Sequence, residues 1–283
     1  MRAVVLDGIV LGLAFGLLGV GMTLVYGLGG VINLAYGQIV VLGAIVVSLL
    51  MDDGVPTIAA AAVGVLAAAA VAVSLDLTLM RAVYRQRGEE RTLMGLLLTL
   101  GAAFVIGGLL GWRYPDGALY INVSGEPVSI LDVPMALGSI WASVIALVVG
   151  AMLLLFFGFV TFGRGIRSVI QDEIGARLVG INPSLVRTFI FALSGALAGI
   201  VAITYSMSGP LTVNAGFELT TFALIVTVVG GLGSVAGAFL AGVLLGVVNA
   251  LSAHYIGQYI TTIILLGAAA LTILVRPRGL LGR

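Results

Sequence analysis

The segment RSVIQDEIGARLVGIN, residues 167–182, carries the charged and amide side chains best suited to bind another protein. Its apolar residues recur every three or four positions: Ile166, Val169, Ile170, Ile174, Leu178 and Ile181. This spacing predicts one amphipathic helix with a continuous apolar stripe. The remaining positions hold Arg164, Arg167, Ser168, Gln171, Asp172, Glu173 and Arg177. Asn182-Pro183 should end the helix, because the residue before a proline disfavours the helical region.

Such a helix has two common uses. It can lie in the membrane interface with its apolar face among lipid headgroups, and amphipathicity alone favours this use. It can also dock onto a cytoplasmic partner. Acidic and amide side chains at 171–173 interrupt the basic polar face that a membrane anchor would have. Gly175 and Gly180 each cost about 1 kcal/mol of helix stability, which fits a short helix seated closely in a cleft.

A second group of polar residues lies in apolar surroundings, where polar side chains are costly and mark candidate functional sites. Asn33, Tyr36 and Gln38 follow the first glycines of the stretch LVYGLGGVINLAYGQIV. Discontinuous helices at such a break could expose backbone groups to a zwitterionic substrate. The same residues could equally cap a turn. Glu218 begins a short apolar helix, where capping by a carboxylate is favoured over substrate contact.

What the sequence lacks excludes several kinds of chemistry. It has no lysine, and therefore no Walker A motif to bind nucleotide phosphates. It has no cysteine, and therefore no disulfide and no thiolate metal site. The apolar segments also offer no paired carboxylates and no nucleophile beside a base. We expect a protein that is not an enzyme, has no catalytic or metal-binding residues and binds no cofactor itself.

The elements that position these residues must be membrane helices. The chain is 61% hydrophobic and 9% charged, whereas about 25% of residues are charged in a soluble domain. Runs of ~20 apolar residues, enough to span a bilayer, recur throughout. We expect an all-α polytopic bundle, one domain over residues 1–283, with eight or nine crossings. The expected spans are Val4–Val25, Ile58–Met80, Leu93–Trp112, Ser139–Phe162, Thr188–Met207, a short helix from Glu218 to Gly230, Val235–Ser252 and Tyr259–Val275.

One or two of these helices should be glycine-interrupted or re-entrant. The break at Gly29 and Gly30 divides the first apolar region, so that two crossings precede Asp52. The short helix from Glu218 covers only about 20 Å at 1.5 Å per residue. Small residues four apart should let helix backbones approach closely. Such pairs are Gly12/Gly16, Gly107/Gly111, Gly195/Gly199 and Gly242/Gly246.

The arginines predict the orientation of the bundle. Three groups stand at the breaks between spans: residues 81–91, residues 164–187 and residues 276–283. The positive-inside rule places all three groups on the cytoplasmic side. The C-terminus is then cytoplasmic and the N-terminus external. The first apolar run is longer than a signal-peptide core, so we expect it to be a retained span.

Several segments together resemble one family. GRGIRSVIQDEIGARLVGIN closely resembles the cytoplasmic loop of ABC-transporter permeases for branched-chain amino acids, with Glu173, Ala176 and Gly180 at E-x-x-A-x-x-x-G spacing. The stretches LVYGLGGVINLAYGQIVVLGA, VVGGLGSVAGAFLAGVLLG and the terminal RPRGLLG are similar to those permeases too, so the resemblance covers nearly the whole chain. The family often has His where this sequence has Tyr36, which puts in doubt an ionisable role there. Related permeases for urea and short amides share the pattern.

The resemblance implies a role for each part. The loop 163–187 would form a coupling helix in a groove of an ATPase subunit, carried by Arg164, Arg167, Gln171, Asp172, Glu173, Ala176 and Gly180. Implied partners are two cytoplasmic ATPase subunits that bind ATP and Mg²⁺, a second related permease subunit, an external substrate-binding protein and membrane lipid, but no nucleic acid. The implied function is import of branched-chain amino acids across a prokaryotic cell membrane by alternating access. A urea or amide permease, an ATP-independent channel and an ion-driven transporter are the alternatives.

Overall fold

The structure, a computed structural model, describes residues 1–86, 88–123, 126–130, 132–276 and 279–281. The first half contains α1 (Arg2–Gly29), α2 (Tyr36–Asp52), α3 (Thr57–Leu75), a π-helical turn (Asp76–Met80), α4 (Arg81–Val83) and α5 (Gly88–Arg113). Three short strands follow: β1 (Ala118–Leu119), β2 (Val128–Ile130) and β3 (Val133–Met135). The rest contains α6 (Leu137–Phe159), α7 (Thr161–Gln171), α8 (Glu173–Leu178), α9 (Pro183–Ser208), β4 (Leu211–Thr212), a 3₁₀ turn (Val213–Ala215), α10 (Gly216–Gly230), α11 (Val235–Ile256) and α12 (Gln258–Val275).

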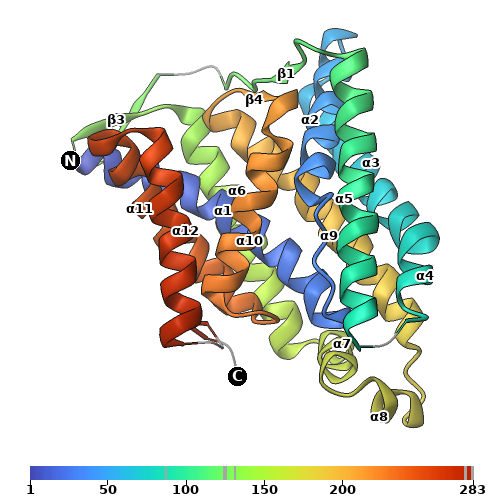
Figure 1. Cartoon of the computed structure of the whole chain (residues 1–283). Coiled ribbons are helices and arrows are strands. Elements are labelled where there is room, and N and C mark those ends of the chain that lie inside the picture. The colour runs from blue at the N-terminus through green and yellow to red at the C-terminus, as the bar shows by residue number, and fades with distance from the viewer. Residues whose placement is uncertain (87, 124–125, 131, 277–278, 282–283) are drawn as a thin grey trace.

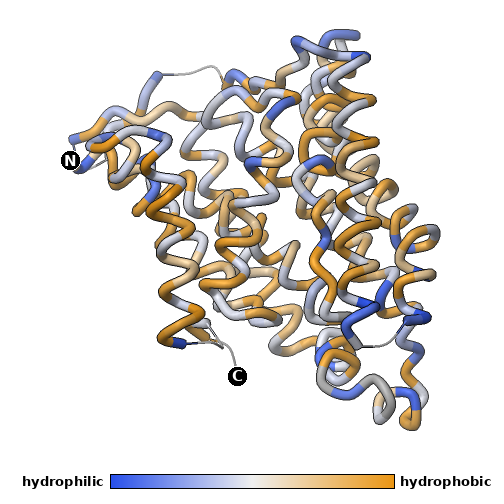
Figure 2. Tube along the Cα trace, in the orientation of Figure 1, coloured by the Kyte–Doolittle hydropathy of each residue, from blue (hydrophilic) through white to orange (hydrophobic). Residues whose placement is uncertain are grey.

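The chain is a polytopic all-α membrane bundle. In its described part, eight helices are long and apolar enough to cross a bilayer, and α2, with 17 residues, is a shorter apolar helix. Counting α2, which extends about 25 Å at 1.5 Å per residue, gives the ninth crossing. The expectation of eight or nine crossings is confirmed. Figure 2 shows hydrophobic residues along the bundle and hydrophilic stretches mainly towards its two ends.

The connections lie at two opposite ends of the bundle (Figure 1). Helices α7 and α8 lie at one end, together with the end of α12. The N-terminus and strands β1, β3 and β4 lie at the other end, where β1 pairs with β4 in antiparallel register. The segments predicted to be cytoplasmic thus share one end, and the N-terminus, predicted to be external, lies at the other. Which end faces the cytoplasm stays a prediction.

Three helices form the centre of the bundle. Most residues in the apolar stretches of α1, α9 and α10 are buried, whereas α3, α5 and α12 are mainly exposed at the periphery. Figure 1 shows α1 running obliquely across the bundle rather than parallel to its neighbours. The oblique path explains why α1 has 28 residues, more than the predicted Val4–Val25. A tilted helix needs more residues to cross the same thickness.

Glycines let α1 and α11 approach at backbone distance. A Cβ added to Gly246 would lie 2.1 Å from Cα of Gly12, and one added to Gly242 would lie 2.2 Å from the backbone nitrogen of Gly16. These two predicted pairs therefore face each other across one interface, as expected for close membrane helix packing. Gly195 and Gly199 likewise contact the backbone of α3. Gly111 differs from the prediction, because open space surrounds it.

The predicted break after the first helix is present. Gly30 ends α1 with a left-handed φ of 63°, and its N–H donates to the carbonyl of Tyr26 at 2.7 Å. Residues 31–35 are not helical, and α2 begins at Tyr36. The segment between α5 and α6 contains the three short strands β1, β2 and β3. Their partners, including β4 some 90 residues later, cannot be read from such short apolar runs.

Candidate functional site

The polar loop 163–187 packs one face against the bundle. Ile166 and Val169 of α7 are buried in the hydrophobic core. Ile170 lies beside α1, where its Cδ1 is 3.3 Å from the position of a Cβ added to Gly27. The apolar face of α7 is therefore covered by protein. This geometry favours the docking alternative over a helix whose apolar face lies in lipid headgroups.

The predicted single helix is wrong in one respect. Asp172 adopts an extended conformation, with φ −151° and ψ 99°, so the segment forms two helices, α7 and α8. The carbonyl of Asp172 accepts the first hydrogen bond of α8, from the N–H of Ala176 at 3.0 Å. Aspartate is a preferred residue just before a helix because its backbone and short side chain suit that position. The 3.6-residue period continues through a one-residue break, which is why periodicity alone missed it.

Gly180 and Ala176 shape the end of α8. Gly180 has φ +85°, and its N–H donates to the carbonyl of Arg177 while the N–H of Ile181 donates to the carbonyl of Ala176. This pattern is a Schellman motif, which requires a residue at positive φ and favours glycine there. Ala176 is buried in the core. Gly180 therefore forms the turn that ends α8, and Ala176 packs against its own chain.

The two predicted coupling arginines have partners in the residues just before the loop. The guanidinium of Arg167 donates to the carbonyl of Phe157 and, at 3.5 Å, to that of Gly158. These carbonyls belong to the last turn of α6, which has no intrahelical donors left for them. Arg164 donates to the hydroxyl of Thr161 at 3.4 Å. Arg167 thus ties α7 to the end of α6.

The opposite side of the loop is exposed and mixed in character. Asp172 and Arg177 are exposed beside two apolar side chains, Leu178 at 84% and Val179 at 75% exposure. For Gln171 and Glu173 the structure describes the helical backbone, and their side chains lie outside the described part. Exposed apolar side chains among mixed charges are typical of a surface that contacts another protein.

Two threonines from other helices hold the break between α1 and α2. The hydroxyl of Thr220 on α10 accepts from the N–H of Gly37 at 3.0 Å, and it lies 3.3 Å from the carbonyl of Leu34. The hydroxyl of Thr99 on α5 accepts from the N–H of Leu34 at 3.2 Å. Both threonines are buried. The sequence analysis missed them, since their partners lie 65 or more residues away and no local pattern marks them.

The predicted pathway residues Asn33 and Tyr36 are used by the fold itself. Oδ1 of Asn33 accepts from the N–H of Ala35 at 3.1 Å, so Asn33 caps the turn before α2. The hydroxyl of Tyr36 donates to the carbonyl of Ser194 at 3.3 Å, and the ring is fully buried. The Tyr36 side chain occupies space that is free because residue 21 is glycine. A Cβ added to Gly21 would lie 1.8 Å from the Tyr36 hydroxyl oxygen. For Asn33 the capping alternative accounts for the geometry, whereas Tyr36 packs in the core.

Gln38 differs from its neighbours because its amide oxygen has no hydrogen-bond partner. Gln38 is 3% exposed, and its Oε1 is buried and unsatisfied among the described residues. Its amide packs between two glycines. A Cβ added to Gly216 on α10 would lie 2.4 Å from this amide, and a Cβ added to Gly107 on α5 would lie 2.9 Å from it. Gln38 therefore closes the junction of α2, α5 and α10. An unsatisfied buried acceptor costs about 1–3 kcal/mol.

The fourth predicted residue, Glu218, lies apart from this junction. It occupies the first turn of α10, as expected for a carboxylate near a helix N-terminus, and it is exposed. Two positions later, Thr220 contacts the break. The structure thus brings Gln38 and Thr220 into one buried polar junction and leaves Glu218 outside it.

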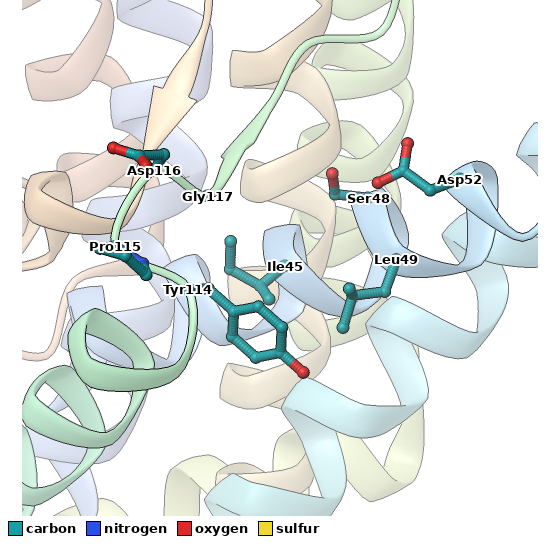
Figure 3. Close-up of a pocket in the computed structure, with 8 residues that line it drawn as sticks. All are labelled: Ile45, Ser48, Leu49, Asp52, Tyr114, Pro115, Asp116 and Gly117. Atoms are coloured by element: carbon teal, nitrogen blue, oxygen red, sulfur yellow. The ribbon is translucent and has the colours of Figure 1, made fainter.

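A cavity of about 240 Å³ lies where α2 ends beside the loop that follows α5 (Figure 3). Helix α2 supplies Ile45, Ser48, Leu49 and Asp52, and the loop supplies residues 114–117. The hydroxyl of Ser48 donates to the carbonyl of Ala118 at 3.2 Å, which fixes β1 above α2. Across the described residues, no three His, Cys, Asp or Glu side chains gather closely enough to hold a metal ion.

Membrane-spanning helices around a discontinuous helix, with a packed amphipathic segment at one end, define a polytopic permease-type bundle. The sequence matches the family model described as "Branched-chain amino acid transport system / permease component" over residues 4–275. The chain belongs to this family.

Individual relatives agree with the family. The chain is 28% identical to the high-affinity branched-chain amino acid transport system permease protein BraD of Pseudomonas aeruginosa, covering 98% of this chain and 94% of that one. It is 27% identical to the corresponding protein LivH of Escherichia coli K12, with the same coverage. Among solved structures it resembles PsaBC from Streptococcus pneumoniae in complex with Fab, with a TM-score of 0.53 and 13% identity over 96% of this chain and 91% of that chain. That likeness concerns the fold alone.

Proposed function

We propose that this chain is the membrane-spanning subunit of an ATP-binding-cassette importer that moves branched-chain amino acids into a prokaryotic cell. Two separate ATPase subunits would bind ATP and Mg²⁺, a second related permease subunit would complete the pathway, and an external binding protein would deliver the substrate. The C-terminus and the α7–α8 segment would be cytoplasmic. The names of the relatives support the substrate class.

One observation supports this proposal: α7 covers its apolar face with the bundle, and α8 with the residue after it leaves a mixed surface exposed. That surface includes Leu178 and Val179, which no neighbouring part of the described chain buries. Exposed apolar residues beside charges suit a protein partner, whereas a membrane anchor would turn its apolar side to lipid. A permease without its own nucleotide site needs such a contact, because ATP hydrolysis must act on it from outside.

The packing of α7 suggests how a movement at this surface reaches the pathway. Arg167 links α7 to the end of α6, and Ile170 packs beside Gly27 near the end of α1. Two residues after Gly27, α1 ends, and the break that follows leads into α2 and Gln38. ATPase closure that shifts α7 would therefore act on α1 and the break together. A rigid packed chain of helices transmits such a displacement.

Gln38 is the residue that we assign to the substrate pathway. In the structure it closes the junction between α5 and α10 with an unpaired amide oxygen. When these helices separate, that oxygen becomes available to accept from the ammonium group of a passing amino acid or from water. Hydration of the oxygen would stabilise the open form by part of the 1–3 kcal/mol that its burial costs. A neutral amide contacts the substrate without holding it tightly.

Transport in proteoliposomes tests the proposed function. We expect ATP-dependent uptake of leucine when the chain is reconstituted with its second permease, ATPase and binding-protein partners, and no leucine or urea flux from the chain alone. Leu178→Asp and Glu173→Arg should abolish uptake and ATPase co-purification while the chain still inserts. Val128→Asp is the matched control and should leave both unchanged, because Val128 is exposed and pairs with β3, which lies at the other end of the bundle. ATP-independent flux through the chain alone would instead indicate a channel.

A further inference from the structure

An arginine at the start of α5 has one edge of its guanidinium group without an acceptor. Nε and Nη2 of Arg91 are both buried, and neither has a hydrogen-bond partner among the described residues. These two nitrogens lie on the same edge of the guanidinium plane, with a spacing that matches two oxygens of one phosphate or carboxylate group. Buried donors are almost always hydrogen-bonded, so this edge calls for an acceptor from outside the described residues.

The surroundings of Arg91 are strongly cationic. The guanidinium carbons of Arg91 and Arg187 lie 4.7 Å and 4.3 Å from the centroid of the same ring, that of Tyr84. Both distances are within the range of cation–π contact. The buried carboxylate nearby, Asp76, has Arg81 and Arg187 as its electrostatic neighbours. Arg91 itself forms no ion pair with a described residue, so no described carboxylate lies close enough to pair with its guanidinium group.

Apolar surface adjoins this cationic corner. Two leucines on the first turns of α5 point outward, Leu93 at 60% and Leu97 at 68% exposure, and Leu77 of the π-helical turn is also exposed. The corner lies at the end of the bundle that carries α7 and α8 (Figure 1). Glu89 and Glu90, at the tip of α5, are exposed and precede Arg91 along the chain. Arg91 thus stands where the polar tip of α5 meets its lipid-facing surface.

We propose that Arg91, supported by Arg187, binds the phosphate group of an anionic phospholipid in the leaflet at this end of the bundle. The free edge of Arg91 would receive two phosphate oxygens, and the acyl chains would lie along Leu93 and Leu97. Arginine is well suited to this role because its rigid fork forms paired charge-assisted hydrogen bonds. The adjacent apolar surface favours a lipid over inorganic phosphate or an acidic segment of a protein. A lipid held here bridges the starts of α5 and α9.

Native mass spectrometry of the purified full chain tests this site. We expect phosphatidylglycerol to bind at least tenfold more tightly than phosphatidylcholine, and Arg91→Gln to remove most of that preference. Arg85→Gln is the matched control, because Arg85 is exposed in the same segment and should not change lipid binding. Arg91→Lys keeps the positive charge but lacks the paired donors of the planar guanidinium group, so it should bind phosphatidylglycerol with intermediate affinity. Phosphatidylglycerol should also raise the melting temperature of the parent chain more than that of Arg91→Gln.

Three results would overturn the proposal. The first is equal binding of the anionic and zwitterionic lipids by the parent chain. The second is an Arg91→Gln variant that keeps the full preference, or an Arg85→Gln variant that loses as much of it. The third is displacement of the lipid by millimolar inorganic phosphate, which would show a general anion site. If Arg91→Gln does not fold, the comparison of Arg91→Lys with the parent chain and the lipid-dependent melting temperatures decide the question.

Discussion

Thr220→Val should loosen the break between α1 and α2 while preserving the shape of the side chain. The Thr220 hydroxyl accepts from the N–H of Gly37 at 3.0 Å, and the residue is 4% exposed. Valine removes this acceptor and leaves a buried N–H unsatisfied, which costs about 1–3 kcal/mol. The free energy of unfolding of the substituted chain should fall by that amount.

The neighbouring Thr221 provides the control. Its hydroxyl bonds to the carbonyl of Phe217 within its own helix and lies at the surface. Thr221→Val should change the free energy of unfolding by no more than about 0.5 kcal/mol, as is usual for surface substitutions. Unfolding in mixed micelles of mild detergent and dodecyl sulfate, followed by circular dichroism, compares the two variants under identical conditions. Equal stability of Thr220→Val and Thr221→Val would refute the role of Thr220 in holding the break.

Three further substitutions follow from the packing. Gly246→Ala should destabilise the bundle by roughly 1–3 kcal/mol because its Cβ would overlap the backbone of α1, whereas Gly267→Ala, in open space on α12, should be neutral in the same unfolding assay. Asn182→Ala should cost about 1 kcal/mol, since Oδ1 of Asn182 accepts from the N–H of Ser184 at the start of α9; an unchanged melting temperature would contradict this. Leu280→Pro removes an N–H that donates to the end of α10 at 2.9 Å. It should increase hydrogen exchange at residues 226–230 and leave exchange in α3 unchanged.

The sequence predicted the membrane bundle because hydropathy is a strong local signal. A run of ~20 apolar residues has few other uses, and glycines four residues apart favour close helix packing wherever their partner lies. The pairing of Gly12 with Gly246, however, depends on which helices become neighbours. The oblique path of α1 and the antiparallel pair β1–β4 also depend on contacts between distant segments, so they were not predictable from local patterns.

The candidate site was predictable in outline and not in detail. The amphipathic period correctly indicated that α7 buries its apolar face, but it gave no sign of the break at Asp172. It also placed Leu178 on the apolar stripe, although Leu178 is 84% exposed. Asn33 and Tyr36 were recognised as unusual, although their capping and core roles depend on Ala35 and Ser194. Thr220 was missed because a threonine within an apolar helix is common, and only its contact with a distant break distinguishes it.

The absence of cysteine from the sequence makes the central claim directly testable. Leu178 ends α8 and Val128 pairs with β3, so the two exposed residues lie at opposite ends of the bundle. The single-cysteine variants Leu178→Cys and Val128→Cys can be labelled in membrane vesicles with a maleimide that does not cross the bilayer. We expect Leu178→Cys to react only in inverted vesicles and to be protected there when the ATPase subunits are co-expressed. Val128→Cys should react only in right-side-out vesicles. Labelling of Leu178→Cys from the outside, or equal labelling with and without the ATPase, would contradict the account.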